Sequence, residues 1–305
     1  MAFGAFATAA PVQPDSAPRR RSKVALLLLL PGIAYLALFF LVPLVSLVLT
    51  SFQAKTPGTD IGVYDYAFKI ENYGLVFNTY SEHMLRSLLY AVVATVLALL
   101  FSYPLAYFIG VTLRRFPLLQ SLALTLVIAP FFISFLLRTL AWKQILSDEG
   151  AVISTLKALS LLGSDAHFTG TPGAVIFGLA YNFIPFMTLP IYTSLEKLDL
   201  RYVEAGGDLY ANPARTFLSV TLPLSAPGVI SGTLLTFIPI SGDFVNASNA
   251  FLGSSETAMV GNVIESQFFT SQNYPIAAAL SIILMGAILV LVSIYVRRSG
   301  TEDLV

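Results

Sequence analysis

Cysteine is absent from this chain of 305 residues, and charged residues are scarce. Without thiols the chain has no disulfide, no thiolate nucleophile and no sulfur ligand for a metal. Its 17 basic residues are balanced by 17 acidic ones, so no basic surplus points to nucleic acid as a partner. The two histidines, His83 and His167, lie far apart in sequence without a metal-ligand pattern around either. We therefore predict no metal site.

A nucleotide-binding loop is missing as well. The sequence contains no Gly-Lys pair, which excludes the P-loop of an ATPase. An intramembrane enzyme is a remote alternative, because the apolar stretches hold few ionisable groups and no Ser-His pairing. We predict a chain that is not an enzyme and that binds no cofactor itself.

Apolar residues are what the chain has in abundance. Hydrophobic residues make up 56% of the sequence and charged residues only 11%, with a mean hydropathy of +0.78. These values are typical of an integral membrane protein. Six apolar runs are each long enough to cross a bilayer as a helix. They cover residues 24–50, 87–113, 116–137, 172–195, 222–243 and 275–296. The fold class predicted is all-α, a polytopic membrane protein with six transmembrane helices.

The ends of the chain set the predicted topology. Residues 1–23 are rich in Ala, Pro and Ser and finish in a basic cluster, which predicts a disordered cytoplasmic tail. A signal peptide is the alternative, but the first apolar run is too long for one. We expect the six-span membrane domain over 24–298 and a short tail over 299–305. Most of the 17 Lys and Arg residues then lie on the side of both termini, which predicts cytoplasmic termini.

Two segments between the runs are predicted to lie on the outer side. Residues 51–83 are polar without a regular period, which indicates a loop. Residues 142–170 carry apolar side chains at near-helical spacing, which favours an amphipathic helix at the outer membrane interface.

The segment over about 198–223 is the one structured polar element on the cytoplasmic side. Asp199 is suited to cap a first helix, on which Glu204 and Asp208 share one face because they are four residues apart. Asn212 followed by Pro213 is typical of a second helix start. The pattern predicts helix, turn, helix. The spacing alone leaves open whether the acidic face is merely solvated or docks a partner.

Several residues of this segment resemble a family motif. They are Glu204-Ala205-Gly206, Asp208-Leu209, Ala211, Phe217, Val220, Leu222-Pro223 and Pro227-Gly228. Together they resemble the EAA loop of permease subunits in type I ABC importers. The resemblance implies that the loop forms coupling helices seated on cytoplasmic ATP-binding subunits. The implied ATPase-coupling residues are Glu204, Ala205, Gly206, Asp208, Leu209, Tyr210 and Ala211.

Two residues depart from the motif. Gly206 stands where alanine is usual, and Tyr210 stands where the family has the glycine of the turn. A non-glycine residue at positive φ costs about 1–2 kcal/mol. Either Tyr210 stays helical and the turn moves to Ala211 and Asn212, or Tyr210 is strained.

Three further stretches resemble the spermidine/putrescine permeases of the same family. They are residues 137–142 (LRTLAW), 185–190 (PFMTLP) and the region that holds 242–245 (GDFV), 252–253 and 261–264 before 267–268. The resemblance implies a second permease subunit, two ATP-binding subunits that hold ATP and Mg²⁺, an extracytoplasmic binding protein and the cytoplasmic membrane of a prokaryote. Permeases for ferric iron, thiamine, oxyanions or phosphonates are the alternative.

The predicted substrate path begins at Asp243. This residue precedes Phe244 near the outer end of the fifth run, with Glu265, Phe268 and Tyr181 as further candidates. Position alone also fits a carboxylate of an interfacial loop. No Lys or Arg occurs between 215 and 297, so the region suits a cation better than an anion.

Overall fold

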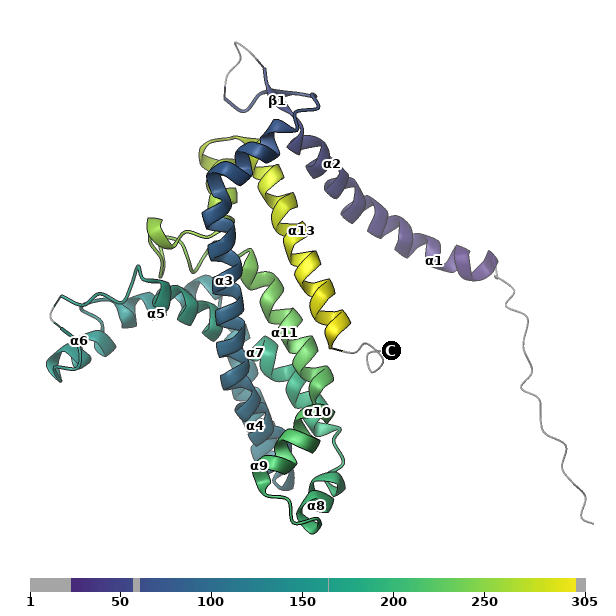
Figure 1. Ribbon diagram of the computed structural model, residues 1–305, viewed down its shortest axis with the longest axis vertical. Helices are drawn as coiled ribbons and strands as arrows, with labels where there is room; N and C mark the ends of the chain where they lie inside the picture. Colours follow the sequence, from purple (N-terminus) through teal and green to yellow (C-terminus); the bar gives the residue numbers. More distant parts are fainter. Residues whose placement is uncertain (1–22, 57–60, 164, 300–305) are drawn as a thin grey trace, which may run out of the picture. The chain divides into compact units, whose positions relative to one another are not determined.

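The computed structural model describes residues 23–56, 61–163 and 165–299, and this part of the chain is almost entirely helical (Figure 1). Clustering of contacts divides the chain into two units, residues 1–46 and 47–305. The elements in chain order are α1 (Lys23–Leu36), η1 (Ala37–Leu41), α2 (Val42–Ser51), β1 (Ala54–Lys55), β2 (Tyr64–Asp65), α3 (Glu71–Tyr107), η2 (Phe108–Thr112), η3 (Leu113–Arg115), α4 (Pro117–Ile128), η4 (Ala129–Phe132), α5 (Phe135–Leu146), α6 (Ala151–Ala158), α7 (Pro172–Glu196), α8 (Arg201–Asp208), α9 (Pro213–Thr216), η5 (Phe217–Thr221), α10 (Leu222–Leu224), α11 (Ala226–Ser241), η6 (Ser255–Thr257), α12 (Val260–Glu265), η7 (Ser266–Thr270) and α13 (Tyr274–Arg298).

The first apolar run forms one continuous helical stretch. Residues 27–51 are helical over 25 residues, with a π turn at η1 between two α-helical parts. Pro31 and Pro43 do not end the helix, as the sequence predicts for a membrane span. Residues 1–22 of the predicted disordered tail and residues 300–305 of the predicted C-terminal tail lie outside the described residues.

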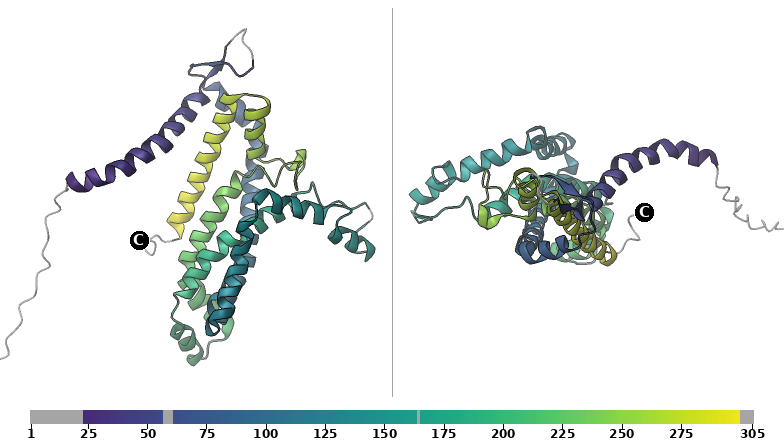
Figure 2. Two further views of the ribbon diagram at one scale, coloured as in Figure 1. Left: turned by 180° about the vertical axis from the view of Figure 1, so that it is seen from behind. Right: turned by 90° about the horizontal axis from the view of Figure 1, so that it is seen from above.

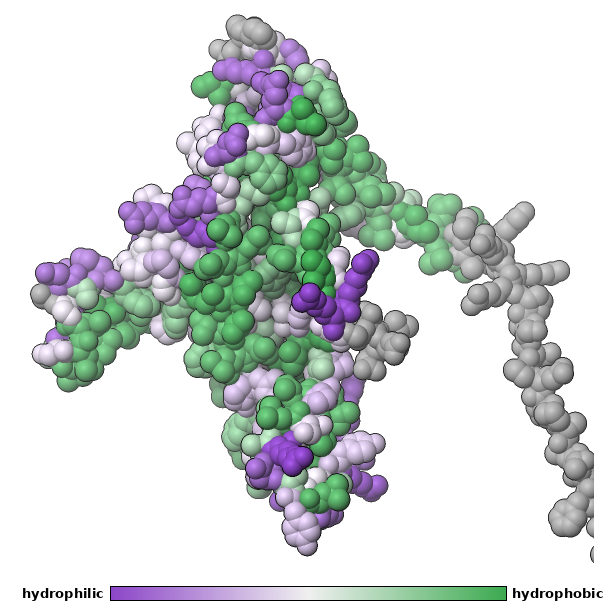
Figure 3. Space-filling model, in the orientation of Figure 1, coloured by the Kyte–Doolittle hydropathy of each residue, from purple (hydrophilic) through white to green (hydrophobic). Residues whose placement is uncertain are grey.

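Three of the other apolar runs lie in single helices of membrane-spanning length, and the remaining two lie in bent helix pairs. Among the described residues, four helices are long and apolar enough to cross a bilayer by themselves, and two bent helix pairs bring the number to six. The bent pairs are Pro117–Phe132 with Phe135–Ala158, and Pro213–Leu224 with Ala226–Ser241. In the space-filling view, hydrophobic residues cover much of α3 and α13, and hydrophilic residues gather toward the ends (Figure 3).

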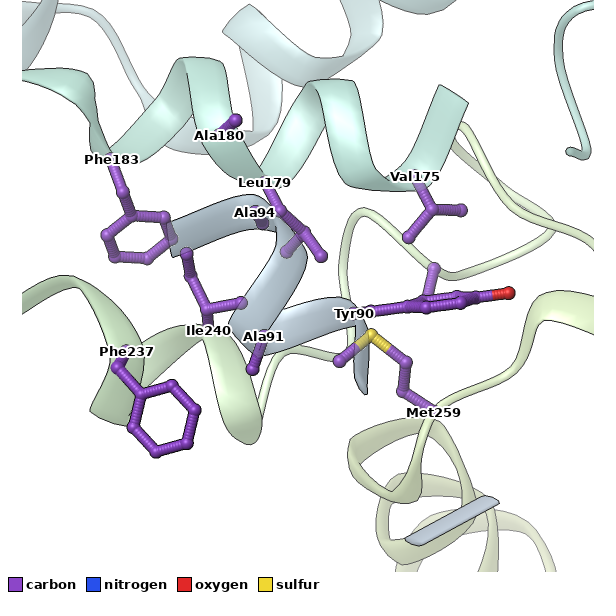
Figure 4. Close-up of a cluster of buried hydrophobic side chains, with 11 residues drawn as sticks. Tyr90, Ala91, Ala94, Val175, Leu179, Ala180, Phe183, Phe237, Ile240 and Met259 are labelled. Atoms are coloured by element: carbon purple, nitrogen blue, oxygen red, sulfur yellow. The ribbon is translucent and has the colours of Figure 1, made fainter. Parts of the chain in front are cut away.

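Helix α7 is the central element of the second unit. In its apolar window 61% of the residues are buried, against 33% for α3 and for α13. It packs between α3 and α11, and side chains from these three helices form most of one buried hydrophobic cluster, which Ala247 and Met259 complete. Figure 4 shows one part of that core, in which Ala91 and Ala94 of α3, Leu179 and Phe183 of α7, and Ile240 of α11 face one another.

Two glycines four residues apart let α11 approach α7. A Cβ at Gly228 would lie 2.6 Å from the carbonyl oxygen of Pro190, and one at Gly232 would lie 2.9 Å from that of Met187. Small residues at this spacing are a common contact between membrane helices, because they let the backbones come close. The spacing therefore fixes where the two helices cross.

The predicted outer loop over 51–83 is wrong in its second half. A short hairpin of β1 and β2 is followed by α3, which begins at Glu71, well before the apolar run that starts at residue 87. The extension is helical because one of its faces, with Val76, Tyr80 and Met84, packs against Ile276 and Leu280 of α13. The helical spacing of these apolar residues is hard to recognise in the sequence, because most of the residues between them are polar.

The predicted third span, residues 116–137, is also wrong at its second end. Helix α4 ends at Ile128, and after the 3₁₀ turn η4 the chain bends by 95° into α5. Pro130 lies in that turn, where a residue without an N–H interrupts the α-helical hydrogen bonds. Both views of Figure 2 show α5 and α6 leading away from the helices α3, α7 and α11.

The predicted amphipathic helix over 142–170 is split in two. Its first residues are the end of α5, and α6 follows after a break at Ser147–Gly150. A Cβ at Gly150 would lie 2.4 Å from the carbonyl oxygens of Gln144 and Ile145, so the chain passes too close there for any other residue. Only the short helix α6, with Ile153 buried, retains the predicted amphipathic character.

Candidate functional site

The α8–α9 loop, residues 198–223, folds as its sequence predicts. Asp199 Oδ1 accepts a hydrogen bond from the N–H of Arg201 at 3.0 Å, at the first residue of α8. Asn212 Oδ1 accepts one from the N–H of Arg215 at 2.7 Å, with Pro213 as the first residue of α9. These local bonds satisfy N–H groups that have no partner within the helices.

The tip of this loop exposes both charge and apolar surface. Glu204 and Asp208 are both exposed on α8, four residues apart. Leu209 is 80% exposed and Tyr210 is 99% exposed. Large apolar side chains at a polar tip are typical of a surface that another protein covers.

Tyr210 occupies the left-handed region, with φ at +57°. The N–H of Tyr210 bonds the carbonyl of Gly207 at 2.9 Å, and that of Ala211 bonds the carbonyl of Gly206 at 3.1 Å. This is the Schellman ending, which places its left-handed residue at position 210. The turn therefore stays where the family has glycine, and the alternative of a turn at Ala211 and Asn212 is wrong.

The other departure, Gly206, has a packing reason. A Cβ at this position would lie 2.9 Å from Cγ2 and 3.0 Å from Oγ1 of Thr216. Thr216 is buried at the end of α9, so its side chain fills the space that an alanine methyl would take. Glycine here lets α8 and α9 approach each other closely.

Three contacts tie the loop, together with Ser225 just after it, to the helix bundle. Arg114 Nη1 donates to the carbonyl of Leu198 at 2.8 Å. The ring of Phe217 meets the ring of Tyr103 edge-on, with centroids 5.4 Å apart, and the Tyr103 hydroxyl bonds the Ser225 hydroxyl at 2.7 Å. Ser225 is the break of the second bent pair, where the chain turns by 66°.

A chain of buried polar side chains lies at the other end of α11. Asp243 is 8% exposed, and its Oδ1 and Oδ2 accept from the backbone N–H and the side-chain amide of Asn246 at 2.8 and 3.1 Å. Asn182 of α7 donates to Asn246 Oδ1 at 3.2 Å and to Thr139 Oγ1 of α5 at 3.1 Å. This Asp243 network joins α5, α7 and the loop after α11.

The remaining predicted path residues lie in different surroundings. Phe244 is 48% exposed and Glu265 is exposed, and the side-chain amide of Asn262 donates to the carbonyl of Phe244 at 2.6 Å. Phe268 packs against Tyr274, with ring centroids 5.1 Å apart. Tyr181 packs instead against Trp142 at 5.1 Å. Among the described residues, no hydrogen bond or ring contact joins the five predicted side chains directly.

Sequence reasoning missed Asn182 and Thr139 as site residues. A single asparagine within an apolar membrane run is itself a signal, because an unpaired amide in hydrocarbon is costly. It also missed Arg138, which is buried beside the Phe135 ring at 5.9 Å. Its Nε and Nη1 have no hydrogen-bond partner within the described chain.

Comparison with known proteins decides the family. Residues 102–299 match the family described as "Binding-protein-dependent transport system inner membrane component". The chain belongs to this family. It is thus a multi-pass membrane permease of the ABC importer type, and it is a transport subunit rather than an enzyme.

Named relatives resemble the permease over most of its length. It is 36% identical over 267 residues to the "Spermidine/putrescine transport system permease protein PotB" of Haemophilus influenzae, covering 87% of this chain and 91% of the relative. The protein of that name in Escherichia coli is 34% identical, and the match covers 88% of this chain and 94% of the relative. The "Inner membrane ABC transporter permease protein YdcU" of Escherichia coli is 26% identical, and the match covers 82% of this chain and 79% of the relative.

Solved structures share the fold of the permease. A chain from the "Crystal structure of a bacterial ABC transporter involved in the import of the acidic polysaccharide alginate" aligns with a TM-score of 0.67 at 18% identity. The alignment covers 93% of this chain and 97% of that one. At this identity the likeness establishes the type I importer fold.

Proposed function

We propose that the permease is the membrane-spanning subunit of an ABC importer for polyamines such as spermidine and putrescine. The observation that carries this proposal is the 34–36% identity, over nearly the whole chain, to permeases named for these substrates. The charge pattern supports it, because no Lys or Arg lies between Arg215 and Arg297. An ammonium group taken from water needs carboxylates or aromatic faces in its path, and a basic side chain there would repel it.

We propose further that the α8–α9 loop couples this subunit to two ATP-binding subunits in the cytoplasm. The support is its shape: an exposed acidic face on α8, an exposed tip at Leu209 and Tyr210, and the edge-on contact of the Phe217 ring with Tyr103 of α3. Glu204, Ala205, Gly206, Asp208 and Ala211 would form the docking surface with that tip. Closure of the partner subunits would then move α3 and α11 together.

The proposed assembly has a second permease subunit and an extracytoplasmic binding protein. ATP and Mg²⁺ belong to the partner subunits, and this chain holds no cofactor. Both termini are placed in the cytoplasm of a prokaryote, because the basic residues concentrate on that side of the cytoplasmic membrane. The proposed substrate path runs past Asp243, Phe244, Tyr181, Glu265 and Phe268, and Asp243 also holds the loop that follows α11 through Asn246.

Reconstitution tests the substrate. The complete complex in proteoliposomes, with its binding protein, should take up labelled spermidine or putrescine only when ATP is supplied to the ATPase side. Thiamine, ferric iron, phosphonate and an oxyanion are the matched competitors. ATP-driven uptake of one of these, without polyamine uptake, would assign the permease to another small solute.

A charge reversal tests the coupling loop. Glu204→Lys should leave the subunit folded and inserted, because the side chain is exposed. It should weaken recovery of the ATP-binding subunits, since a charge in a partly desolvated contact affects association strongly. Glu256→Lys, on an exposed turn outside this loop, is the control. Equal recovery and transport in both variants would remove Glu204 from the docking surface.

A further inference from the structure

A cavity of about 380 Å³ lies between α3, α12 and the loop that follows α11. Sites for small ligands commonly have volumes of about 300–1,000 Å³. Most of the residues that line it are of polar types, and they include Tyr80, Asn249, Asn262, Glu265, Ser266 and Gln267. We call it the α12 cavity.

The α12 cavity lies beyond the membrane-spanning part of α3. The last charges before the apolar run of α3 are Glu82 and Arg86, and the run begins at residue 87. Tyr80 precedes that run by about two helical turns, which is roughly 10 Å at the helical rise. The cavity is thus at the aqueous end of α3, on the outer side in the proposed topology.

Among the described residues, Glu265 is the only charged one on the wall of the cavity. It is exposed, and among the described residues it forms no ion pair. The cation on the neighbouring turn of α3, Arg86, is already engaged. It pairs with Glu82 and donates from Nη1 to the carbonyl of Ala258 at 3.1 Å. A ligand in the cavity therefore meets an uncompensated negative charge.

The rest of the wall is held in place by its own hydrogen bonds. Gln267 Nε2 donates to the Tyr80 hydroxyl at 3.2 Å, which connects η7 to α3. Asn262 Oδ1 accepts from the N–H of Met259 at 3.0 Å, and its amide donates to the carbonyl of Phe244. The aromatic ring of Tyr80 thus has a fixed position on the wall that also carries Glu265.

We propose that the α12 cavity is an entry site that binds an aliphatic ammonium group of the substrate before it enters the membrane path. Glu265 supplies a charge-assisted hydrogen bond, and the Tyr80 ring supplies a face that attracts a cation. The hydroxyl and amide groups around them replace water on the remaining N–H donors. This assignment rests on the proposed polyamine function and names the place where the substrate first meets the permease.

The absence of cysteine makes a direct test possible, because a single introduced thiol is the one labelling site in this chain. Ser266→Cys places a thiol on the cavity wall. In the complete complex, spermidine at about ten times its Kd should slow labelling of this thiol by a neutral methanethiosulfonate about tenfold, by mass action. Adding Glu265→Gln should abolish this protection. The uncharged chain analogue 1,4-butanediol should give none.

Thr270→Cys is the matched control, because it is exposed on the same π turn but outside the cavity wall. Its labelling should not respond to spermidine. Glu256→Gln removes a nearby carboxylate that does not line the cavity, and it should leave the protection of Ser266→Cys intact. If Glu256→Gln abolishes the protection as fully as Glu265→Gln does, the site assignment is wrong, and the protection arises from the general negative charge of this surface.

Transport separates this inference from the function on which it rests. If the complex imports spermidine and Ser266→Cys is not protected, the cavity assignment is wrong and the polyamine function stands. If the complex imports no polyamine but does import another solute, the proposed function is wrong, whatever the labelling shows. Protection together with import, both weakened by Glu265→Gln, supports the two proposals.

Discussion

At the scale of single residues, Tyr210 combines backbone strain with full exposure. Its positive φ costs about 1–2 kcal/mol, and its ring gains nothing from packing within this chain. Tyr210→Gly should therefore stabilise the isolated subunit by about 0.5–1 kcal/mol after the entropy of glycine is counted. Ala205→Gly, in the middle of α8, should destabilise it by about 1 kcal/mol. Thermal unfolding of the two variants checks the contrast, and the same sign for both would contradict it.

Gly206 and Gly207 form a second matched pair in α8. A Cβ at Gly207 meets no atom within 4 Å, whereas one at Gly206 meets Thr216 at 2.9 Å. Gly207→Ala should stabilise the subunit by about 1 kcal/mol through helix propensity. Gly206→Ala should not gain this stability, because its methyl group would push α8 away from α9. Adding Thr216→Ser to Gly206→Ala should restore part of the stability, because it removes the methyl group of Thr216. The unfolding midpoints of the three variants check this prediction. Equal stabilisation by Gly206→Ala and Gly207→Ala would contradict it, because α9 would then move aside without a measurable cost.

At the scale of elements, the Asp243 network connects three segments through one carboxylate. In Asp243→Asn a side-chain amide faces the amide of Asn246, so a buried donor loses its acceptor at a cost of about 1–3 kcal/mol. The exchanged pair Asp243→Asn with Asn246→Asp keeps the charge and restores a donor opposite an acceptor. We expect the single variant to lower the unfolding midpoint and transport, and the exchange to recover both. Recovery of stability without transport would instead make the position of the charge essential to the substrate.

The same elements show how far the sequence alone could lead. Apolar runs predicted the spanning helices, and Asn212 with Pro213 predicted the start of α9, because both signals are local. The early start of α3 was missed because its reason is the contact of Val76 with α13, distant in sequence. The sequence could not decide between a turn at Tyr210 and a turn at Ala211 and Asn212, since both satisfied the local rules. Asn182 and Thr139 become partners only when α5 and α7 pack together.

At the scale of the whole molecule, hydrogen bonds link segments that are far apart in sequence at both ends of the bundle. The Tyr64 hydroxyl of the hairpin donates to the carbonyl of Gln272 before α13, at 2.9 Å. At the other end, Arg114 holds the carbonyl of Leu198. Each pair must lie on one side of the membrane, so the side of one member fixes the side of the other. Two orientations therefore remain to be distinguished: the α8–α9 loop lies either on the cytoplasmic side or on the outer side.

Single thiols distinguish those outcomes, because the chain has no cysteine of its own. Asp65→Cys and Asn273→Cys should react with an impermeant maleimide in intact cells, and Arg115→Cys and Arg215→Cys should react only after the membrane is opened. The reason is the excess of basic residues on the side of the α8–α9 loop, which disfavours its transfer across the membrane. Labelling of Arg215→Cys in intact cells would put this loop outside, beyond the reach of any ATP-binding subunit, and the coupling proposal would be lost while the family and the fold stand.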